Sequence, residues 1–218
     1  MENTIEISML DSIGNDHIKS LVEDYGELAL ETVFSNEFVE KIPVVGTIMN
    51  LGTLGATIKD RIFTQKVLKF LFEVKDIGYK EKKDFIDSVN HNTKYRTKVG
   101  SHLLLILDKI DDLEKPTLIG KLFKHALNKN IDYDTFLRLA SIVSRTFTPD
   151  LLELNKVKNQ ELVSNISLEN LQNQGLLSIE LKKHQEKIGT PGINKNPKQV
   201  IEYKLNFLSE LLIKYAIN

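Results

Sequence analysis

The densest group of acidic side chains in this chain lies within one short stretch and comprises Asp108, Asp111, Asp112 and Glu114. Carboxylates three or four residues apart share a helix face, and their oxygens are the ligands that hard divalent cations prefer. Lys109 and Lys115 are interleaved with these acids, and apolar residues recur on the opposite side of the predicted helix. A solvated helix surface explains this pattern better than a cation site does. We therefore expect no bound metal here.

Other signatures of catalysis are missing from the sequence. The chain has no cysteine, and its five histidines never occur as an i, i+4 pair, so a zinc site would need assembly from distant positions. Gly52 is followed by Thr53 and Leu54, where a phosphate-binding loop needs lysine and a hydroxyl residue. No serine nucleophile elbow is present. We expect the protein not to be an enzyme, with no catalytic, cofactor-binding or metal-binding residue.

One local charge bias lies near the C-terminus. Against a single acid, Glu186, and beside His184, the sequence places five lysines: Lys182, Lys183, Lys187, Lys195 and Lys198. The whole chain has 29 basic and 30 acidic residues, so this stretch is a local positive patch that could contact a nucleic-acid backbone. The neighbouring predicted helix at 167–174 contains no arginine or lysine, although specific DNA readers usually place them there. A solvated loop is therefore favoured over a DNA contact.

A second unusual segment covers residues 42–58, which carry no charge over seventeen positions. It opens near Pro43 and is spaced by Gly46, Gly52 and Gly55. Glycines at such intervals allow a helix to pack close to a neighbour, and an apolar stretch can also enter a membrane. A helix of this length spans roughly 25 Å, slightly less than a bilayer core. A buried helix outside the membrane is the favoured interpretation, and membrane entry is the alternative.

Composition limits the remaining choices. With 41% hydrophobic and 27% charged residues over 218 positions, the chain can bury one substantial core or two small ones. A chain of this size without cysteine is typical of an intracellular protein. Residues 1–14 contain Glu2, Glu6 and Asp11 and lack the basic and apolar regions of a secretory signal. We expect a cytoplasmic location, with the surface of the inner membrane as the alternative.

The fold class that follows is mainly α. Helical periodicity after the capping pair Asn15 and Asp16 predicts a helix from 18 to 33, and Pro43 suits the first turn of the next. Further apolar stripes predict helices over 62–74, 81–89, 99–113, 118–128 and 134–147. Thr148, Pro149 and Asp150 give the start signal of another helix. A multi-helix bundle over 1–130 is therefore expected.

The C-terminal region, 131–218, has a different pattern. Ser167 can cap a short helix that Gly175 ends, and apolar residues then alternate with polar ones over 176–181 and again over 200–205. A connector too long for a tight hairpin joins these two predicted strands, and Asn206 can cap a final helix over 207–216. A short helix followed by a two-stranded hairpin is the order of a winged helix. We expect a winged-helix-like unit with a small β-hairpin, half-buried on one face.

These features together resemble a known family. The glycine-bearing apolar region is followed by an all-helical middle with the run LLLILDKIDDLEKPTLIGKLF at 103–123, and then by LENLQNQGLL at 168–177 leading into a hairpin and helix. This order is similar to that of the abortive-infection alpha (Abi-alpha) family. The resemblance implies a role in bacterial defence against phage without an enzymatic activity. It carries over no catalytic position.

Three functions are consistent with these observations. The favoured one is a non-enzymatic effector or accessory protein of anti-phage defence, acting through oligomerisation, membrane engagement or protein binding. The first alternative is a DNA-binding winged-helix regulator, and the second is a helical protein-interaction module. A protein partner or self-association is the expected mode of action, while membrane or nucleic-acid binding are alternatives.

Overall fold

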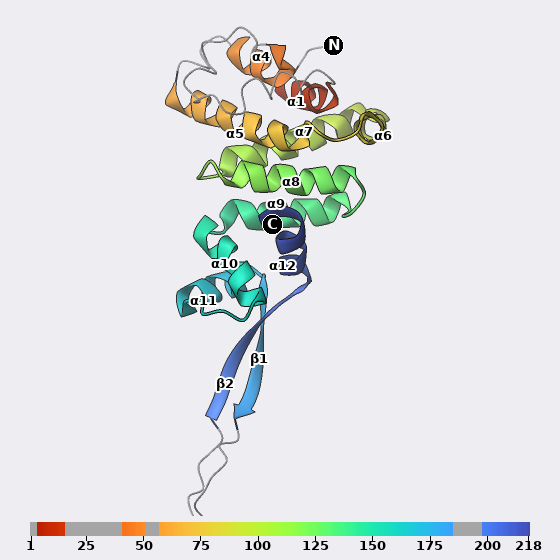
Figure 1. Cartoon of the computed structure of the whole chain (residues 1–218). Coiled ribbons are helices and arrows are strands. Elements are labelled where there is room, and N and C mark those ends of the chain that lie inside the picture. Colours follow the sequence, from red (N-terminus) through yellow and green to blue (C-terminus); the bar gives the residue numbers. More distant parts are fainter. Residues whose placement is uncertain (1–3, 16–40, 51–56, 185–197) are drawn as a thin grey trace, which may run out of the picture. The chain divides into compact units, whose positions relative to one another are not determined.

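The computed structural model describes residues 4–15, 41–50, 57–184 and 198–218. In this part of the chain it contains ten α-helices and one two-stranded sheet (Figure 1). The predicted mainly α class with a small hairpin is therefore confirmed. The helix predicted for 18–33 lies outside the described residues. So do Gly52, Gly55, Lys187 and Lys195.

The chain divides into two compact units, Met1–Arg145 and Thr146–Asn218. The sequence placed the boundary near Asn130, fifteen residues earlier. The helix between the two positions, α9 (Tyr133–Arg145), packs on α8 (Lys115–Leu127) in the first unit. Its inward residues are buried with those of that unit. The helix therefore belongs to the first unit and does not begin the second.

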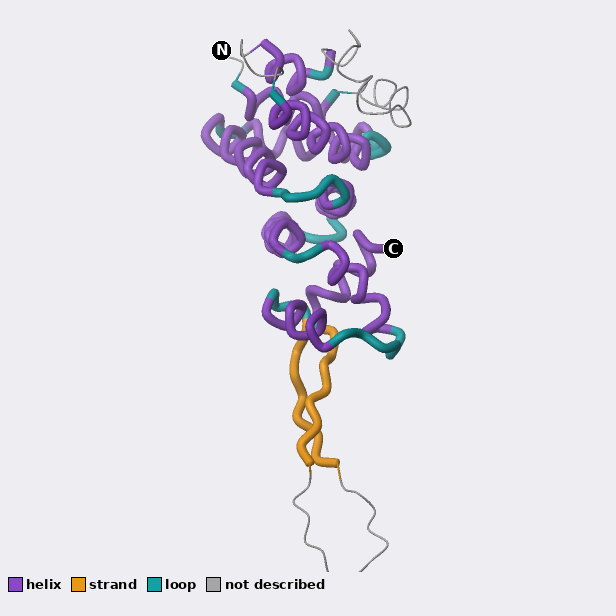
Figure 2. Tube along the Cα trace, turned by 90° about the vertical axis from the view of Figure 1, so that its left-hand side faces the viewer, coloured by secondary structure: helices purple, strands orange, loops and turns teal. Residues whose placement is uncertain are grey.

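Helices form the whole described part of the first unit. Besides α8 and α9 they are α1 (Ile5–Gly14), α4 (Pro43–Asn50), α5 (Ile58–Val74), α6 (Tyr79–Asn90) and α7 (Thr93–Lys109). The main packing pairs are α5 with α8, α1 with both α4 and α7, and α8 with α9 (Figures 1 and 2). The apolar stripes that predicted most of these helices face these contacts, as hydrophobic burial requires.

An aromatic cluster lies where four of these helices meet. The ring centroid of Phe123 in α8 lies 5.4 Å from that of Phe70 in α5, 5.4 Å from that of Phe85 in α6 and 5.2 Å from that of Phe136 in α9. Two of the three ring pairs are edge-on, the geometry that aromatic quadrupoles favour. Phe70, Phe123 and Phe136 are fully buried, so this cluster is a main part of the core.

Two helix crossings depend on glycine. A Cβ atom placed on Gly100 of α7 would lie 2.2 Å from the carbonyl oxygen of Glu6 in α1. A Cβ atom on Gly120 of α8 would lie 2.9 Å from the carbonyl oxygen of Phe70 in α5. Both helix backbones thus approach at a distance that leaves no room for a side chain. Close helix packing through glycine occurs in this protein, but the sequence had assigned it to residues 42–58.

The described parts of the segment 42–58 belong to two helices. As predicted, Pro43 opens a helix, α4, which is described as far as Asn50, and residues 51–56 lie outside the described part of the chain. Thr57 has an extended backbone and caps α5 by accepting a hydrogen bond from Asp60 N. Helix α5 therefore begins at Ile58, four residues before its predicted start, because Thr57 and Asp60 three residues later complete a capping box. Gly46 is buried in α4, which packs on α1.

The contact between α1 and α4 is made by buried hydroxyls. Ser12 Oγ accepts a hydrogen bond of 2.9 Å from Val44 N and donates one of 2.8 Å to Ser8 O. Ser8 Oγ lies 2.7 Å from Thr47 Oγ1, which itself donates to Pro43 O. Ser12 thus satisfies a first-turn N–H of α4 from another helix.

None of the helices formed by the described residues combines the length and apolar character needed to span a bilayer.

Two buried lysines hold the ends of helices. Lys66 of α5 is only 7% exposed. Its Nζ donates to Ile110 O, just after the end of α7, at 2.5 Å, and to Asp108 O, in the last turn of α7, at 3.3 Å. Lys115 is 1% exposed, and its Nζ donates to Ser144 O of α9 at 3.2 Å and pairs with Asp111 at 2.5 Å. Both ammonium groups meet the negative end of a helix dipole. Burial lowers the pKa of Lys66, and Asp108 and Asp111 oppose this shift.

The acidic stretch at 108–114 is mostly a connection between helices. Helix α7 ends at Lys109 and α8 begins at Lys115, so the expected continuous helix surface is incorrect. Asp112 Oδ1 accepts hydrogen bonds from the backbone N–H groups of Glu114 and Lys115, at 2.8 and 3.0 Å. This local capping favours a turn over helix continuation. Across the described residues, no group of three or more acidic, histidine or cysteine side chains is arranged to hold a metal.

The described part of the second unit consists of three α-helices, a hairpin and a terminal π-helix. Its elements are α10 (Thr148–Lys158), α11 (Asn165–Asn173), β1 (Leu177–His184), β2 (Lys198–Leu205), α12 (Phe207–Leu212) and a π-helix, Ile213–Ile217. Ser164, and not Ser167, caps α11 by accepting from Ser167 N. Gly175 ends it at φ +77°, as predicted. Leu176 N and Gly175 N bond back to Leu171 O and Gln172 O, the paired bonds of a Schellman motif.

The predicted hairpin is confirmed. Strands β1 and β2 are antiparallel, with Leu177 opposite Leu205, Ile179 opposite Tyr203 and Leu181 opposite Ile201. Each strand extends beyond its predicted end, to His184 and from Lys198. The hairpin therefore includes residues that the sequence had assigned to the connector.

Candidate interaction surface

The hairpin presents an exposed apolar face. Because side chains alternate along a strand, register partners Leu181 and Ile201 share one face with the pair Ile179 and Tyr203. The exposed fractions are 44% for Ile179, 64% for Leu181 and 53% for Ile201, and Tyr203 is half-buried. We call these four residues the apolar hairpin face. It leaves large aliphatic side chains in contact with water.

The opposite face is charged and internally paired. Lys182 Nζ lies 2.6 Å from Glu202, and Lys204 Nζ lies 2.5 Å from Glu180, both of them diagonal pairs across the strands. A second contact of Lys204, to Glu202 on its own strand, is 4.0 Å. The hydrogen bond from Lys182 lowers the pKa of Glu202, and the one to Glu180 raises the pKa of Lys204. Cross-strand pairs of this kind set the register and keep this face in water.

The base of the hairpin is fixed to its unit. Leu176 and Leu177 are buried, and Asn206 Nδ2 donates to Gly175 O at 2.8 Å while Asn206 N bonds to Leu176 O at 3.4 Å. Asn206 also caps α12, where its side chain accepts from Leu208 N and Ser209 N. One asparagine thus joins the end of α11, the end of β2 and the start of α12. The apolar hairpin face begins where this support ends.

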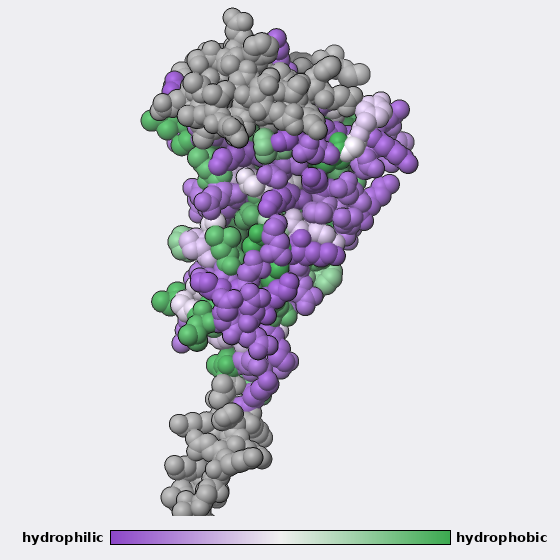
Figure 3. Space-filling view, viewed as in Figure 1, coloured by the Kyte–Doolittle hydropathy of each residue, from purple (hydrophilic) through white to green (hydrophobic). Residues whose placement is uncertain are grey.

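Further apolar side chains of the second unit are exposed near α11. Leu162 is 98% exposed in the connection before α11, and Ile166 in its first turn is 72% exposed. Figure 3 shows hydrophobic side chains over α11 and the adjoining part of the hairpin, with hydrophilic side chains over much of the remaining surface of this unit. Exposed aliphatic groups gathered in this way are typical of protein contact sites.

The lysines of the predicted positive patch do not lie in one loop. Lys182 and Lys183 belong to β1, Lys198 belongs to β2, and Lys182 is paired with Glu202. Helix α11, the candidate DNA reader, contains Glu169 and no basic residue, and its Asn170 donates to the buried Asp150 at 3.1 Å. The described residues therefore offer less positive charge to a phosphate backbone than the sequence pattern indicated.

The residues that sequence reasoning missed are those of the apolar hairpin face. The alternating pattern predicted that Ile179, Leu181 and Ile201 would be half-buried against a core. In the described part of the chain the hairpin is a two-stranded ribbon, and these three side chains are exposed instead. The signal that was available is the number of predicted strands, since two strands alone seldom bury a face.

Comparison with known proteins finds no matching family model, no matching curated protein and no matching solved structure.

Proposed function

We propose that this protein is a non-enzymatic effector or accessory protein of bacterial anti-phage defence, of the abortive-infection type, which acts by self-association through its hairpin. The observation that supports this proposal is the apolar hairpin face, which lies opposite a face whose charges are paired within the same hairpin. Such a ribbon has one side suited to water and one suited to a protein contact.

The occupant that fits this face is the same face of a second copy. A two-fold axis that lies in the contact plane, parallel to the two faces, places each apolar residue against the apolar residues of the partner, because an isologous contact needs only a self-complementary patch. Leu181 and Ile201 already lie side by side across the ladder, so the centre of the patch is entirely aliphatic. The pairs between Lys182 and Glu202 and between Lys204 and Glu180 stay in water in this arrangement.

The strand edges offer a different contact, side by side, that competes with the face-to-face one. In a two-stranded sheet each strand has an outer edge with backbone donors and acceptors available to another chain. Lysines on and beside the strands, including Lys204, oppose unlimited edge pairing, as they do in natural edge strands. A closed dimer is therefore favoured over a growing fibre.

The expected affinity is modest. Ile179, Leu181 and Ile201 are each about half exposed, so complete burial of each contributes about 1 kcal/mol, or about 6 kcal/mol for two copies. Association itself costs about 4 kcal/mol or more. Burial of Tyr203 in both copies must supply the rest. We expect a dissociation constant in the millimolar range, so that assembly depends on local concentration.

Sedimentation of the full chain over a range of concentrations tests the proposal. We expect the average mass to rise from monomer to dimer, and the double variant L181E/I201E to remain monomeric because it places charges at the centre of the contact. The matched control is the swap K182E/E202K, which keeps the ion pair on the charged face and should associate like the wild type. A wild type that stays monomeric at the highest soluble concentration, or a double variant that associates equally well, contradicts self-association.

The role in defence needs a test in cells. Bacteria that produce the protein, with its native neighbouring genes, are infected with phage, and survival of the culture is compared with that of cells producing L181E/I201E. Protection by the wild type and by K182E/E202K, but not by L181E/I201E, supports the proposal. If the wild type gives no protection against any of a broad panel of phages, the defence assignment is wrong even when the dimer forms.

DNA binding is a second candidate function because α10, α11 and the hairpin follow one another in the order of a winged helix. A mobility-shift assay with duplex DNA at low salt distinguishes it, since backbone binding weakens steeply with added salt. A salt-sensitive shift that is lost in a variant with Lys182, Lys183 and Lys187 changed to glutamate favours DNA. Co-sedimentation with anionic liposomes gives the corresponding test for membrane engagement.

A further inference from the structure

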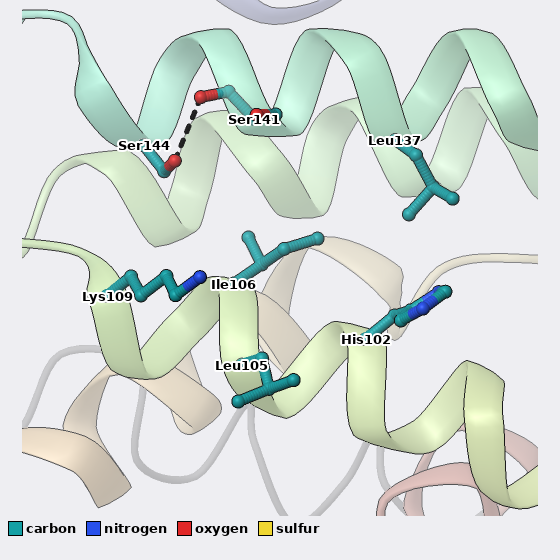
Figure 4. A pocket seen from close by; sticks show the side chains of 7 residues that line it. All are labelled: His102, Leu105, Ile106, Lys109, Leu137, Ser141 and Ser144. Atoms are coloured by element: carbon teal, nitrogen blue, oxygen red, sulfur yellow. Dashed lines mark hydrogen bonds between the residues drawn. The ribbon is translucent and has the colours of Figure 1, made fainter.

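A groove between α7 and α9 lies within the first unit, far in sequence from the hairpin. Its volume is about 260 Å³, and the residues that line it are Leu105, Ile106, Leu137, His102, Lys109, Ser141 and Ser144 (Figure 4). Three are aliphatic, four are polar or basic, and none is acidic. The groove is open to water, since Leu105, Lys109 and Ser141 are exposed.

One end of the groove is suited to a negative charge. The side chain of Lys109 extends along the groove toward Ile106, on the side facing Ser144 (Figure 4). Lys109 forms no ion pair with any described residue. Ser141 Oγ accepts a hydrogen bond of 3.4 Å from Arg145 Nη1, which leaves its own proton to donate. An ammonium group and a hydroxyl donor thus lie at the same end, beside a guanidinium group.

The rest of the groove is suited to an apolar group. Ile106 and Leu137 approach each other from the two helices in Figure 4, and Leu105, which is 54% exposed, extends this wall outward. His102 lies at the other end, and its buried Nδ1 has no hydrogen-bond partner in the described part of the chain. A buried polar atom without a partner is uncommon, and a bound water, ion or ligand is one explanation for it. The lining therefore combines a cationic end, an aliphatic middle and an imidazole.

We propose that this groove binds a small organic anion with an apolar body, such as a medium-chain carboxylate. The carboxylate would accept hydrogen bonds from Lys109 and Ser141, and the chain would lie against Ile106 and Leu137. A cavity of about 150 Å³ holds benzene, so this volume suits a ligand of about ten non-hydrogen atoms. A metal cation is disfavoured because the lining has no carboxylate. This site is independent of self-association.

Octanoate, which has ten non-hydrogen atoms, is a suitable probe for NMR titration of the full chain. We expect saturable shifts of the signals of Ile106, Leu137 and Ser141, with a dissociation constant in the millimolar range for so small a ligand. Lys109→Met keeps the length of the side chain but removes its charge, and should weaken octanoate binding about tenfold. Lys98→Met is the matched control, because Lys98 is exposed on the same helix and does not line the groove.

Two further probes, one neutral and one truncated, separate the contribution of the negative charge from that of the apolar body. Octanamide retains the apolar body without the charge, and it should bind more weakly than octanoate to the wild type and equally well to wild type and Lys109→Met. Acetate retains the charge without the body, and it should bind more weakly than octanoate. The proposal is overturned if octanoate causes no saturable shift in the groove, if octanamide binds as tightly, or if Lys98→Met weakens binding as much as Lys109→Met does.

Discussion

Replacing Gly100 with alanine tests the closest helix contact in the first unit. The added Cβ atom would lie 2.2 Å from the Glu6 carbonyl oxygen and 2.8 Å from its carbonyl carbon. These are backbone atoms of α1, so no side-chain rotation can relieve the overlap. Helix α1 must move away from α7, and the ion pair of 2.5 Å between Arg96 and Asp11, which joins the same two helices, must adjust with it.

The expected change in the free energy of unfolding is the difference between two opposing effects. Alanine is favoured over glycine in a helix interior by about 1 kcal/mol. Overpacking of a close contact costs about 1 to 3 kcal/mol, and the rigid backbone here places the cost at or above the upper end. We therefore expect Gly100→Ala to reduce the free energy of unfolding by about 2 kcal/mol. For a unit of this size the corresponding fall in melting temperature is about 4 to 8 °C.

Calorimetry measures the melting temperature, and amide hydrogen exchange locates the loss of protection. Gly14→Ala is the matched control, because its Cβ atom would lie 3.3 Å from the Cγ1 atom of the Ile86 side chain, which can adjust. That variant should change stability by less than about 0.5 kcal/mol. If Gly100→Ala is as stable as the wild type, or if exchange increases outside α1 and α7, the close contact does not have the role assigned to it.

Four further variants probe two contacts that fix helix ends and two residues with positive φ. Ser12→Ala removes the acceptor for Val44 N and should cost about 1 to 2 kcal/mol in urea unfolding, whereas an unchanged midpoint would mean that this N–H finds another partner. Lys66→Met should cost about 1 to 2 kcal/mol. Because burial lowers the pKa of Lys66, the unfolded state binds more protons between that lowered pKa and the ordinary value of about 10.4, so stability rises with pH across this window. The difference in unfolding free energy between wild type and Lys66→Met should therefore increase from pH 8 to pH 10, and a constant difference would exclude the shift. Lys129→Gly and Gln160→Gly replace residues at φ 59° and 58° and should each stabilise the protein by about 0.5 kcal/mol in thermal melts, where a loss of stability would show that their side chains matter more than their backbone strain.

Much of the architecture was predictable because it depends on local patterns. Apolar stripes at helical spacing predicted the ends of α5 to α9 to within about four residues, apart from the N-terminal end of α7, which begins six residues before its predicted start. The alternation over 177–181 and 201–205 predicted both strands and their pairing. Pro43, Gly175 and Asn206 marked helix ends correctly, since capping is decided by a few adjacent residues.

The remaining features depend on contacts between residues distant in the sequence. Glycines are visible in the sequence, but only the crossing of two helices shows that Gly100 and Gly120 are the ones without room for a side chain. Lys66 and Lys115 are read as surface residues by type, and their burial follows from distant helix ends that need donors. The groove between α7 and α9 combines residues separated by more than thirty positions, so no motif could have predicted it.

The stretch 108–114 contacts cations, but they are side chains of the protein itself and not metal ions. The cations are the ammonium groups of Lys66 and Lys115, which contact the oxygens of Asp108, Ile110 and Asp111. The protein thus carries its own counterions at the junction of α7 and α8. Both ammonium groups are buried, although Asp111 is 73% exposed, so dissolved salt screens the contacts of Lys66 with backbone oxygens less than it screens the exposed pairs on the hairpin. The junction should therefore keep its structure at ionic strengths that weaken the charged face of the hairpin.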